Sequence, residues 1–306
     1  MRLLLVGLLI SCAAAQTTVN RPKITGVAHM AIWVSDIVKA RAFYKDLLGY
    51  EEPFSLNKND GRLDLTFIKI NDRQYVELFP EQQAGTDRLN HISIETSDAE
   101  AMRRYLASKG VPVPAAVNRV RIGNLAFNVK DPDGHTVEIV QYTPDGRTVK
   151  DRGAHIGRAR VSARMMHVGI LVGNLEQSMK FYRDILGFQE FWRGSRDPKM
   201  LQWVNMRVPD GEDYIEFMLY DRIPDPAKRG SQHHICLEVP DMDKAKALLE
   251  ERAGAAGYTQ PMQIRTGINR KRQLNLFDSD GTRTELMEPV TVDGKPAPSS
   301  AAPPPR

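Results

Sequence analysis

The sequence predicts an α+β fold of two tandem modules that contain four strand–helix–strand–strand–strand units in all. The first observation behind this prediction is an internal repeat: HMAIWVSDIVKARAFYKDLLGY begins at His29, and the similar segment HVGILVGNLEQSMKFYRDILGF begins at His167. The second is a pair of turn motifs, DPDG and DSDG, each followed at the same distance by a glutamate. The third is the alternation of apolar residues in the strand-like segments, which is typical of sheets with one face packed on helices.

The units follow one another in the same order along each module. In the first unit, a strand-like segment precedes a helix that Asp36 can cap and Gly49 can end. In the second unit, Asp98 can cap a helix that runs to Lys109, with Gly110 after it. Module 2 repeats this order over 165–219 and 232–288. We expect the strands of module 1 near 24–34, 50–56, 62–70, 73–79, 89–96, 112–116, 120–129 and 134–142.

Composition places the limits of the modules and of the tail. We expect module 1 at 24–143, a basic linker with few apolar residues at 144–163, and module 2 at 164–290. Residues 291–306 are rich in Pro, Ala and Ser and have little to bury, which predicts a disordered tail.

The start of the chain has the features of a targeting segment. Arg2 precedes the apolar run Leu3–Ile10, and small residues at 13–15 fit a cleavage site. We therefore expect residues 1–15 to be a signal peptide and the protein to be secreted or periplasmic. An alternative is that LISC is a lipobox, which would make the protein a lipoprotein anchored through Cys12.

Overall composition excludes several classes of protein. The chain has 306 residues, of which 42% are hydrophobic and 26% charged, which excludes a disordered chain and a polytopic membrane protein. The net charge of +4 is spread along the chain, so we expect no nucleic-acid partner and no stable membrane insertion. With only 2 cysteines, a disulfide framework is also excluded.

The strand alternation separates an apolar face from a face that carries ionisable residues. In the first strand, Met30, Ile32 and Val34 share the face that suits packing under helices, and His29 lies on the other. The second face also carries aromatic residues, which argue for a partly enclosed cavity. These are Trp33, Tyr75, Phe79 and Tyr142.

The same four kinds of position recur on this face in both modules, two His and two Glu each. Neutral imidazoles and carboxylates suit a divalent transition metal, and four ligands leave room for a chelating substrate. We therefore predict one or two divalent ions, with Fe, Zn, Ni, Co or Mn all open, and a small-molecule substrate. The predicted ligands are His29, Glu77, His91 and Glu138 in module 1, and His167, Glu216, His234 and Glu285 in module 2.

At this point the residues resemble a known family. The two repeat segments at His29 and His167, with QYVELFP, LNHISIET and DPDGHTVEI, are similar to the vicinal-oxygen-chelate (VOC) superfamily. That superfamily includes glyoxalase I, bleomycin-resistance proteins and type I extradiol dioxygenases. The resemblance covers about 25–142 and 164–289, and it implies tandem modules of βαβββ units whose mixed sheets form cups around a metal, with the helices outside.

The resemblance also implies a chemistry. The ligand set looks most like that of glyoxalase I or an epimerase, which implies lyase or isomerase chemistry by metal-assisted proton transfer. By resemblance, Glu138 or Glu285 is the catalytic base, with Glu77 or Glu216 as its opposite partner. In the exported location a glutathione substrate would be unusual, which favours another molecule with vicinal oxygens, such as a hydroxyacid, a sugar derivative or a catechol.

Two alternatives remain open. One is an Fe(II) extradiol ring-cleavage dioxygenase, whose triad would be two His and one Glu, although Asn128 and Asn275 stand where that family carries a Tyr. The other is a metal-free small-molecule binding protein of the bleomycin-resistance kind. The protein is expected to be a monomer or a homodimer.

The sequence leaves other points to the structure. It does not show whether the half-sites pair within or across modules. Strand parity favours His234 over its neighbour His233 as the ligand, and Cys236 reads as a buried small residue. His135 and His155 are expected to be exposed, in a turn and in the linker.

Overall fold

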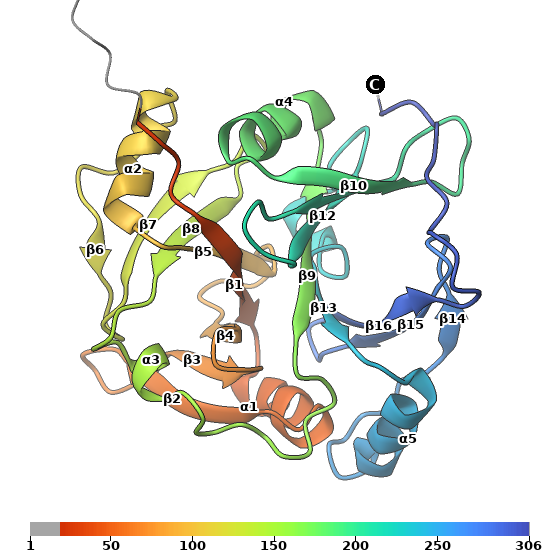
Figure 1. Cartoon of the computed structure of the whole chain (residues 1–306). Helices are drawn as coiled ribbons and strands as arrows, with labels where there is room; N and C mark the ends of the chain where they lie inside the picture. The colour runs from red at the N-terminus through yellow and green to blue at the C-terminus, as the bar shows by residue number, and fades with distance from the viewer. Residues whose placement is uncertain (1–18, 306) are drawn as a thin grey trace, which may run out of the picture.

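The computed structural model describes residues 19–305, so the predicted signal peptide and Cys12 lie outside the described residues. It confirms an α+β fold of tandem modules, each built on a curled, mixed sheet of eight strands. Module 1 runs from red to yellow-green on the left of Figure 1, and module 2 from green to blue on the right. Within the described part of the chain, no helix combines the length and the hydropathy that a membrane span requires.

Module 1 contains two of the predicted units in sequence. Its sheet has the strand order β2-β3-β4-β1-β5-β8-β7-β6, and α3 lies in the segment that leads to module 2. The elements are β1 (Ile24–Val34), α1 (Ile37–Arg41), η1 (Ala42–Leu47), β2 (Glu51–Asn57), β3 (Leu63–Lys69), β4 (Tyr75–Pro80), β5 (Leu89–Thr96), α2 (Ala99–Ser108), β6 (Asn118–Arg119), β7 (Leu125–Lys130), β8 (Thr136–Gln141) and α3 (Arg147–Lys150).

Module 2 repeats this topology with the order β10-β11-β12-β9-β13-β16-β15-β14. Its elements are β9 (Met165–Val172), α4 (Leu175–Met179), η2 (Lys180–Ile185), β10 (Gln189–Gly194), β11 (Trp203–Arg207), β12 (Tyr214–Leu219), η3 (Pro226–Lys228), β13 (His234–Glu238), α5 (Met242–Ala253), β14 (Ile264–Thr266), β15 (Lys271–Phe277) and β16 (Arg283–Thr291).

The two units of each module meet at the centre of the sheet. Strand β1 pairs in parallel with β4 and antiparallel with β5, and β5 pairs in parallel with β8. The strands β9, β12, β13 and β16 pair in the same way in module 2. The first strands of both units are therefore neighbours within one module, and the half-sites pair within modules.

The predicted helix ends are confirmed. The Asp36 carboxylate accepts hydrogen bonds from the backbone N–H groups of Val38 and Lys39, and the Asp98 carboxylate accepts one from Ala101. Gly49 has a φ of +80°, the left-handed conformation that ends a helix at low cost. The last turns of this first helix widen into a π-helical segment, η1, which the sequence did not predict.

One predicted strand of module 1 is absent. The segment 112–116 has no regular structure, and the short strand β6 forms instead at Asn118–Arg119. Pro112 and Pro114 explain the difference, because a proline has no N–H with which to join a sheet ladder.

The faces of the sheets that were predicted to be apolar pack against the helices and form one core that extends through both modules. Helix α2 meets η2, where the Tyr105 hydroxyl donates to the Ile185 carbonyl at 2.7 Å. Helix α5 meets η1, where Arg252 donates to the Leu47 carbonyl at 3.3 Å. Figure 1 shows both meeting places, at the top and at the bottom of the molecule. The two cups consequently lie on the sides of the sheets away from this shared core.

The DPDG and DSDG turns connect the modules reciprocally. Asp133, in the turn of module 1, accepts hydrogen bonds from Gly173 N at 3.0 Å and from Ser178 Oγ at 3.2 Å in module 2. Asp280, in the turn of module 2, accepts from Ser35 N at 2.9 Å and from Ser35 Oγ at 2.5 Å in module 1. Each turn therefore caps the junction of the first strand and helix of the other module.

The C-terminal tail differs from the predicted disordered segment. The Trp192 indole N–H donates to the Pro298 carbonyl at 2.9 Å, and the Leu201 N–H donates to the Pro303 carbonyl at 2.6 Å. Ala302 is buried. The tail lacks a core of its own, but it packs on β10 and the segment after it, a contact that composition alone cannot indicate.

Candidate metal centres

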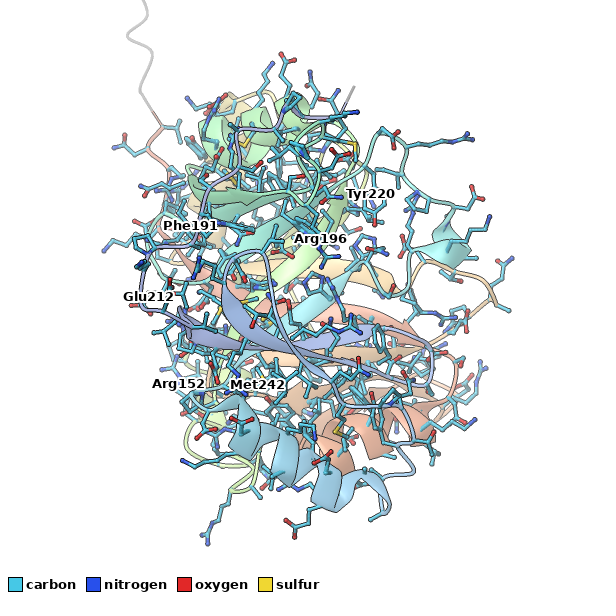
Figure 2. All side chains as sticks on the ribbon, turned by 90° about the vertical axis from the view of Figure 1, so that its right-hand side faces the viewer. Arg152, Phe191, Arg196, Glu212, Tyr220 and Met242 are labelled. Carbon is cyan, nitrogen blue, oxygen red and sulfur yellow. The ribbon has the colours of Figure 1, made fainter. Side chains whose placement is uncertain are left out.

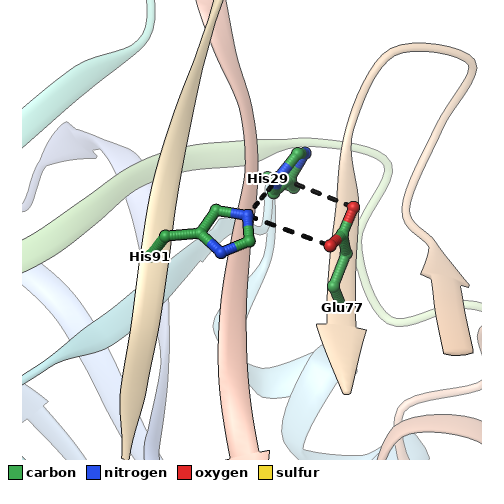
Figure 3. Close-up of side chains that lie close together, drawn as sticks. All are labelled: His29, Glu77 and His91. Carbon is green, nitrogen blue, oxygen red and sulfur yellow. Dashed lines mark hydrogen bonds and ion pairs between the residues drawn. The ribbon is translucent and has the colours of Figure 1, made fainter. Parts of the chain in front are cut away.

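The four predicted ligands of module 1 come together on the cup face of its sheet. They lie on the four central strands, with His29 on β1, Glu77 on β4, His91 on β5 and Glu138 on β8. His29 Nε2 is 2.9 Å from His91 Nε2, 3.5 Å from Glu77 Oε1 and 3.4 Å from Glu138 Oε1. Figure 3 shows the two imidazoles and the Glu77 carboxylate converging on one point.

These distances fit a single divalent ion. Nitrogen and oxygen ligands bind such ions at about 2.1 Å, which places neighbouring ligand atoms of an octahedron roughly 3 Å apart. His29, Glu77 and His91 have ligand atoms that all lie within 4.8 Å of one another, with close separations from 2.9 Å to the 3.9 Å between His91 Nε2 and Glu77 Oε2. Glu138 approaches this group at His29. The two carboxylates also supply the two negative charges that balance a divalent cation.

Neighbouring residues orient this ligand set. The Asn90 carboxamide oxygen lies 2.9 Å from His91 Nδ1, so it can accept the proton of that nitrogen and leave the Nε2 lone pair free for a metal. The Ser93 hydroxyl donates to Glu138 Oε1 at 3.0 Å. Asn90 holds His91 through its second ring nitrogen, as outer partners of metal sites do, whereas Ser93 bonds the same Glu138 oxygen that faces His29.

Without a metal, the ligand set of module 1 favours neutral side chains. Burial lowers the pKa of His91 to about 4, and burial with the nearby His91 lowers the pKa of His29 well below its ordinary value. Burial and the neighbouring Glu138 raise the pKa of Glu77 well above its ordinary value. Burial also raises the pKa of Glu138, against the hydrogen bond from Ser93. Within the described residues neither carboxylate forms an ion pair with a Lys or Arg, so a bound cation would stabilise their ionised forms.

A cavity of about 340 Å³ opens directly onto this ligand set. All four ligands contribute to its wall, and the rest of the wall is mainly apolar and aromatic, including Phe67, Tyr75, Phe79 and Tyr142. Arg119 and Arg121 also line it. The predicted partly enclosed cavity is therefore present in module 1, with three of the four predicted aromatic residues in its wall.

The four predicted ligands of module 2 also come together. His167 Nε2 is 3.1 Å from His234 Nε2 and 3.6 Å from Glu285 Oε2, and His234 Nε2 is 3.5 Å from Glu216 Oε2. His167, His234 and Glu285 form the second group of ligand atoms in the described chain that is compact enough to hold an ion. Gly169 makes room for the His234 ring, because a Cβ built there would lie 1.9 Å from His234 Cε1.

An arginine distinguishes this second group from the first. Arg283 Nη2 lies 2.7 Å from His234 Nδ1 and 3.1 Å from His234 Nε2. Arg283 pairs with His234 across β13 and β16. Thr136 holds the equivalent position in module 1. The two repeats read DGHT and DGTR here, and Thr136 and Arg283 each lie two residues before the glutamate. The guanidinium therefore brings a permanent positive charge to the ligand set of module 2.

This charge reverses the electrostatics of the second group. Burial raises the pKa of Glu285, but hydrogen bonding from His234 and the charge of Arg283 outweigh burial, so the pKa lies below its ordinary value. Burial and Arg283 lower the pKa of His234, but hydrogen bonding to Glu216 and Glu285 outweighs them and raises it. The Glu285 carboxylate is therefore stabilised in its ionised form without a metal.

The second group is also closed to its surroundings. His167 and His234 are 0% exposed, and none of the four ligands lines the cavity of module 2. Tyr214, Met166, Cys236 and Met287 form a small buried cluster beside them. The Tyr214 ring lies 4.5 Å from that of His167, centroid to centroid.

The burial of the remaining histidines and of the cysteine agrees with the predictions in part. Cys236 is fully buried, as predicted, and His155 is exposed. His135 was expected to be exposed, but it is buried because its Nδ1 lies 2.8 Å from Asp131 Oδ2 in the interface between modules. His233 is buried near it, 5.2 Å away between ring centroids.

The sequence identified the candidate ligands but did not identify the polar residues that surround them. Arg283 was visible as the counterpart of Thr136 in the repeat, but nothing in the sequence indicates that its side chain turns towards His234. The same holds for the Asn90 side chain, which turns towards its neighbour His91. It also holds for Arg119 on β6 and for Arg121 just after it, which the fold brings to the cavity.

Curated relatives of the chain are similar at low identity. A lactoylglutathione lyase of Arabidopsis thaliana is 24% identical over 282 residues, which cover 85% of this chain and 90% of the relative. A lactoylglutathione lyase of Pseudomonas putida is 25% identical over 147 residues, which cover 38% of this chain and 84% of the relative.

Solved structures share the fold. An Mn(II)-bound glyoxalase from Novosphingobium aromaticivorans matches with a TM-score of 0.64 and 18% identity, over 87% of this chain and 83% of the other. A catechol 2,3-dioxygenase matches with a TM-score of 0.65 and 17% identity, over 92% of each chain. The sequence model of the glyoxalase/bleomycin resistance protein/dioxygenase superfamily matches residues 26–139 and 164–286, one match in each module. The chain therefore belongs to the glyoxalase/bleomycin resistance protein/dioxygenase superfamily.

Proposed function

We propose that the protein is a divalent-metal-dependent lyase or isomerase that acts in module 1 on a small substrate with vicinal oxygens. The observation that carries this proposal is the position of two His and two Glu in the wall of an aromatic cavity, with His29, Glu77 and His91 close enough together to hold an ion. Four protein ligands leave one or two positions of a six-coordinate ion to the substrate. Two curated relatives named lactoylglutathione lyase support lyase chemistry.

The residues of module 1 divide the work of a proton transfer next to a carbonyl. A bound ion would supply Lewis-acid polarisation of the substrate carbonyl. Glu138 is the base that removes the proton from the carbon next to the carbonyl and delivers it to the former carbonyl carbon. Its Oε1 is oriented by the Ser93 hydroxyl. Glu77, across the ligand set, balances the second charge of the ion. Phe67 and Phe79 exclude water from the carbon that exchanges its proton.

The experiment that tests this proposal combines metal analysis with proton exchange. The purified chain is reconstituted with Zn²⁺, Ni²⁺, Co²⁺ or Mn²⁺, and α-hydroxycarbonyl compounds are incubated with it in D₂O. We expect metal-dependent deuterium incorporation at the carbon next to the carbonyl, and its loss in Glu138→Gln. The matched control is Glu285→Gln, which changes the equivalent residue of module 2 and should retain exchange.

Two results would overturn the proposal. A chain that binds no divalent ion in module 1 excludes this mechanism altogether. Oxygen-sensitive iron together with oxygen uptake in the presence of a catechol would instead support the ring-cleaving dioxygenase, for which His29, His91 and Glu138 are the iron ligands.

We also propose that the protein is exported, with residues 1–15 as the cleaved leader. Support comes from the order of Arg2, the apolar run and the small residues in the sequence. Cell fractionation and N-terminal sequencing of the mature chain test this, and a mature chain that starts at Gln16 is expected. A chain that starts at a lipid-modified Cys12 would support the lipoprotein instead, and an intact cytoplasmic chain would remove the reason to look beyond glutathione-derived substrates.

A further inference from the structure

We propose that module 2 is a metal-independent binding site for a small organic anion, held in the cavity between β10, β12, β15 and the C-terminal tail. This goes beyond the function proposed for module 1 and does not depend on it. Three observations carry it: an internal cation at the ligand set of module 2, an apolar layer that covers this set, and a cavity whose only charged residues are lysines.

The first observation is that module 2 supplies its own cation. Arg283 lies 2.7 Å from His234 Nδ1, inside a ligand set whose carboxylates are within 3.6 Å of His234 Nε2. A divalent ion bound by His234 would lie within a few ångströms of this guanidinium, where two like charges in a buried site repel strongly. Module 1 has the neutral Thr136 in this position, so only its ligand set requires a cation from outside.

The second observation is the layer that separates the ligand set from the cavity. Where module 1 has the small residues Ala28 and Val140 beside its ligands, module 2 has Met166 and Met287. The Tyr214 hydroxyl lies 3.5 Å from Met166 Sδ, and its ring also contributes to the wall of the cavity. These larger side chains fill the space through which a substrate would reach the second ligand set.

The third observation is the chemistry of the cavity itself, which measures about 480 Å³ and lies outside this layer. Phe191, Trp192 and Tyr214 contribute three aromatic rings, and none of the residues in the wall is Asp or Glu. Phe191 is labelled in Figure 2, which faces the side of module 2 where the tail runs. An aromatic wall favours a ligand with a planar or apolar body.

Lys271 and Lys295 determine the charge of that ligand. Lys271 is half-buried in the wall, and burial lowers its pKa. Its neighbours Arg270 and Arg272 pair with carboxylates of Asp293 and Asp243, whereas Lys271 makes none of the ion pairs found in residues 19–305. A half-buried ammonium without a carboxylate partner is stabilised when an anionic ligand binds beside it.

An amide provides a second polar contact for the ligand. Asn205 lines the cavity and is 4% exposed, and its carboxamide oxygen is buried without a hydrogen-bond partner. That oxygen can accept from a hydroxyl of a ligand whose carboxylate meets Lys271. Phe67 occupies the corresponding position in module 1, opposite Glu77 as Asn205 is opposite Glu216. The polar groups of this cavity are therefore specific to module 2.

Isothermal titration of the full chain with benzoate, after removal of metal with EDTA, tests the proposal. We expect one saturable site per chain, with benzamide, the uncharged analogue, binding at least tenfold more weakly. Lys271→Met should weaken benzoate binding at least tenfold, and Lys271→Arg should retain it because the charge is kept. The matched control is Arg265→Met, which removes one cation from the neighbouring strand β14 without altering the cavity.

The outcomes separate this proposal from that for module 1. Equal binding of benzoate by the wild type and by Lys271→Met would overturn it and would point to Arg119 and Arg121 in the other cavity. The absence of saturable binding by the wild type would overturn it as well. Because the titration uses metal-depleted protein, neither result bears on catalysis in module 1.

Discussion

The two modules present the same four candidate ligands on equivalent strands and in equivalent register, yet the side chains around them differ in charge and in size. In module 1 the candidate ligands line an open cavity, and within residues 19–305 none of them forms an ion pair with a Lys or Arg. In module 2 they are closed off, and Arg283 lies among them. The comparison teaches that ligand residues alone do not make a metal centre. Neighbouring residues must also leave the charge of the ligands unbalanced and keep the site accessible.

The difference results from a few substitutions within a conserved frame. Thr136 becomes Arg283, Ala28 becomes Met166 and Val140 becomes Met287, while the strand pairing around them stays the same. Each change adds volume or charge on the cup side only. The shared core on the helix side is unaffected, which explains how the two cups can diverge without loss of the fold.

The largest expected effect separates the modules directly. His91→Ala removes a ligand of module 1, and we expect the metal content to fall from one ion to none per chain and kcat/KM for the exchange reaction to fall at least a thousandfold, or about 4 kcal/mol. Metal analysis by mass spectrometry and the D₂O assay measure the two effects.

The matched variant in module 2 is His234→Ala. It should leave both the metal content and the exchange rate unchanged, because the proposal assigns the reactive ion to module 1. If instead His234→Ala abolished activity and His91→Ala did not, the assignment of the two modules would have to be reversed.

The second prediction concerns the residue that distinguishes the ligand sets. Arg283→Thr introduces the module 1 residue and removes the cation beside His234, so the carboxylates of Glu216 and Glu285 require another counter-charge. We expect the metal content to rise from one ion to two per chain after dialysis against Zn²⁺. Arg272→Thr, on the same sheet but paired with Asp243, serves as the control and should leave one. Two ions already in the wild type would contradict the role of Arg283.

Most of the fold could be predicted from the sequence because its determinants are local. The alternation along β1, the Asp36 and Asp98 caps and the glycine at 49 each act within a few residues. The strand expected at 112–116 does not form for an equally local reason, the two prolines at 112 and 114, although the apolar residues around them resemble a strand. The tail is different, since its order depends on contacts with β10.

The ligand residues were predictable from the repeat, whereas their grouping was not. Whether His29 meets His91 or His234 depends on whether β1 pairs with β5 or with β13, and both strands carry equally suitable alternation. The direction of the Arg283 side chain and the buried contact of His135 with Asp131 likewise depend on packing between distant segments. Local patterns do not encode such contacts.

The first aspartates of the two turn motifs, Asp131 and Asp278, differ in whether their side chains have hydrogen-bond partners, which leads to a third prediction. Asp131 Oδ2 accepts from the Tyr182 hydroxyl at 3.0 Å and lies 2.8 Å from His135 Nδ1. Asp278 Oδ2 is buried without a partner, because Thr282 replaces the histidine. Burial raises the pKa of Asp278 to about 7, with backbone hydrogen bonds and Arg88 opposing the shift and Asp280 adding to it.

The sign of the effect on stability follows from proton uptake. Between the unfolded pKa of about 3.9 and the folded value, the folded chain binds the extra proton, so the free energy of unfolding falls as the pH rises through this window. Asp278→Asn resembles the protonated form, and we expect it to stabilise the chain at pH 8 by up to about 4 kcal/mol and to change little near pH 4. Urea unfolding followed by circular dichroism measures this. Asp131→Asn should destabilise at both pH values, and stabilisation there would contradict the comparison.

The smallest expected effect concerns Ser93, which Cys236 replaces at the equivalent position of module 2. Ser93→Cys keeps the size of the side chain but replaces the O–H···O bond to Glu138, 3.0 Å long, with a weak thiol donor. Since the hydroxyl orients the proposed base, we expect kcat to fall about tenfold with KM nearly unchanged, and affinity for the metal to fall by a similar factor. Ser93→Thr, which retains the hydroxyl, should recover most of the loss. If Ser93→Cys raised KM and left kcat unchanged, the hydroxyl would contact the substrate rather than position Glu138. Ser93 would then not explain a difference in catalysis between the modules.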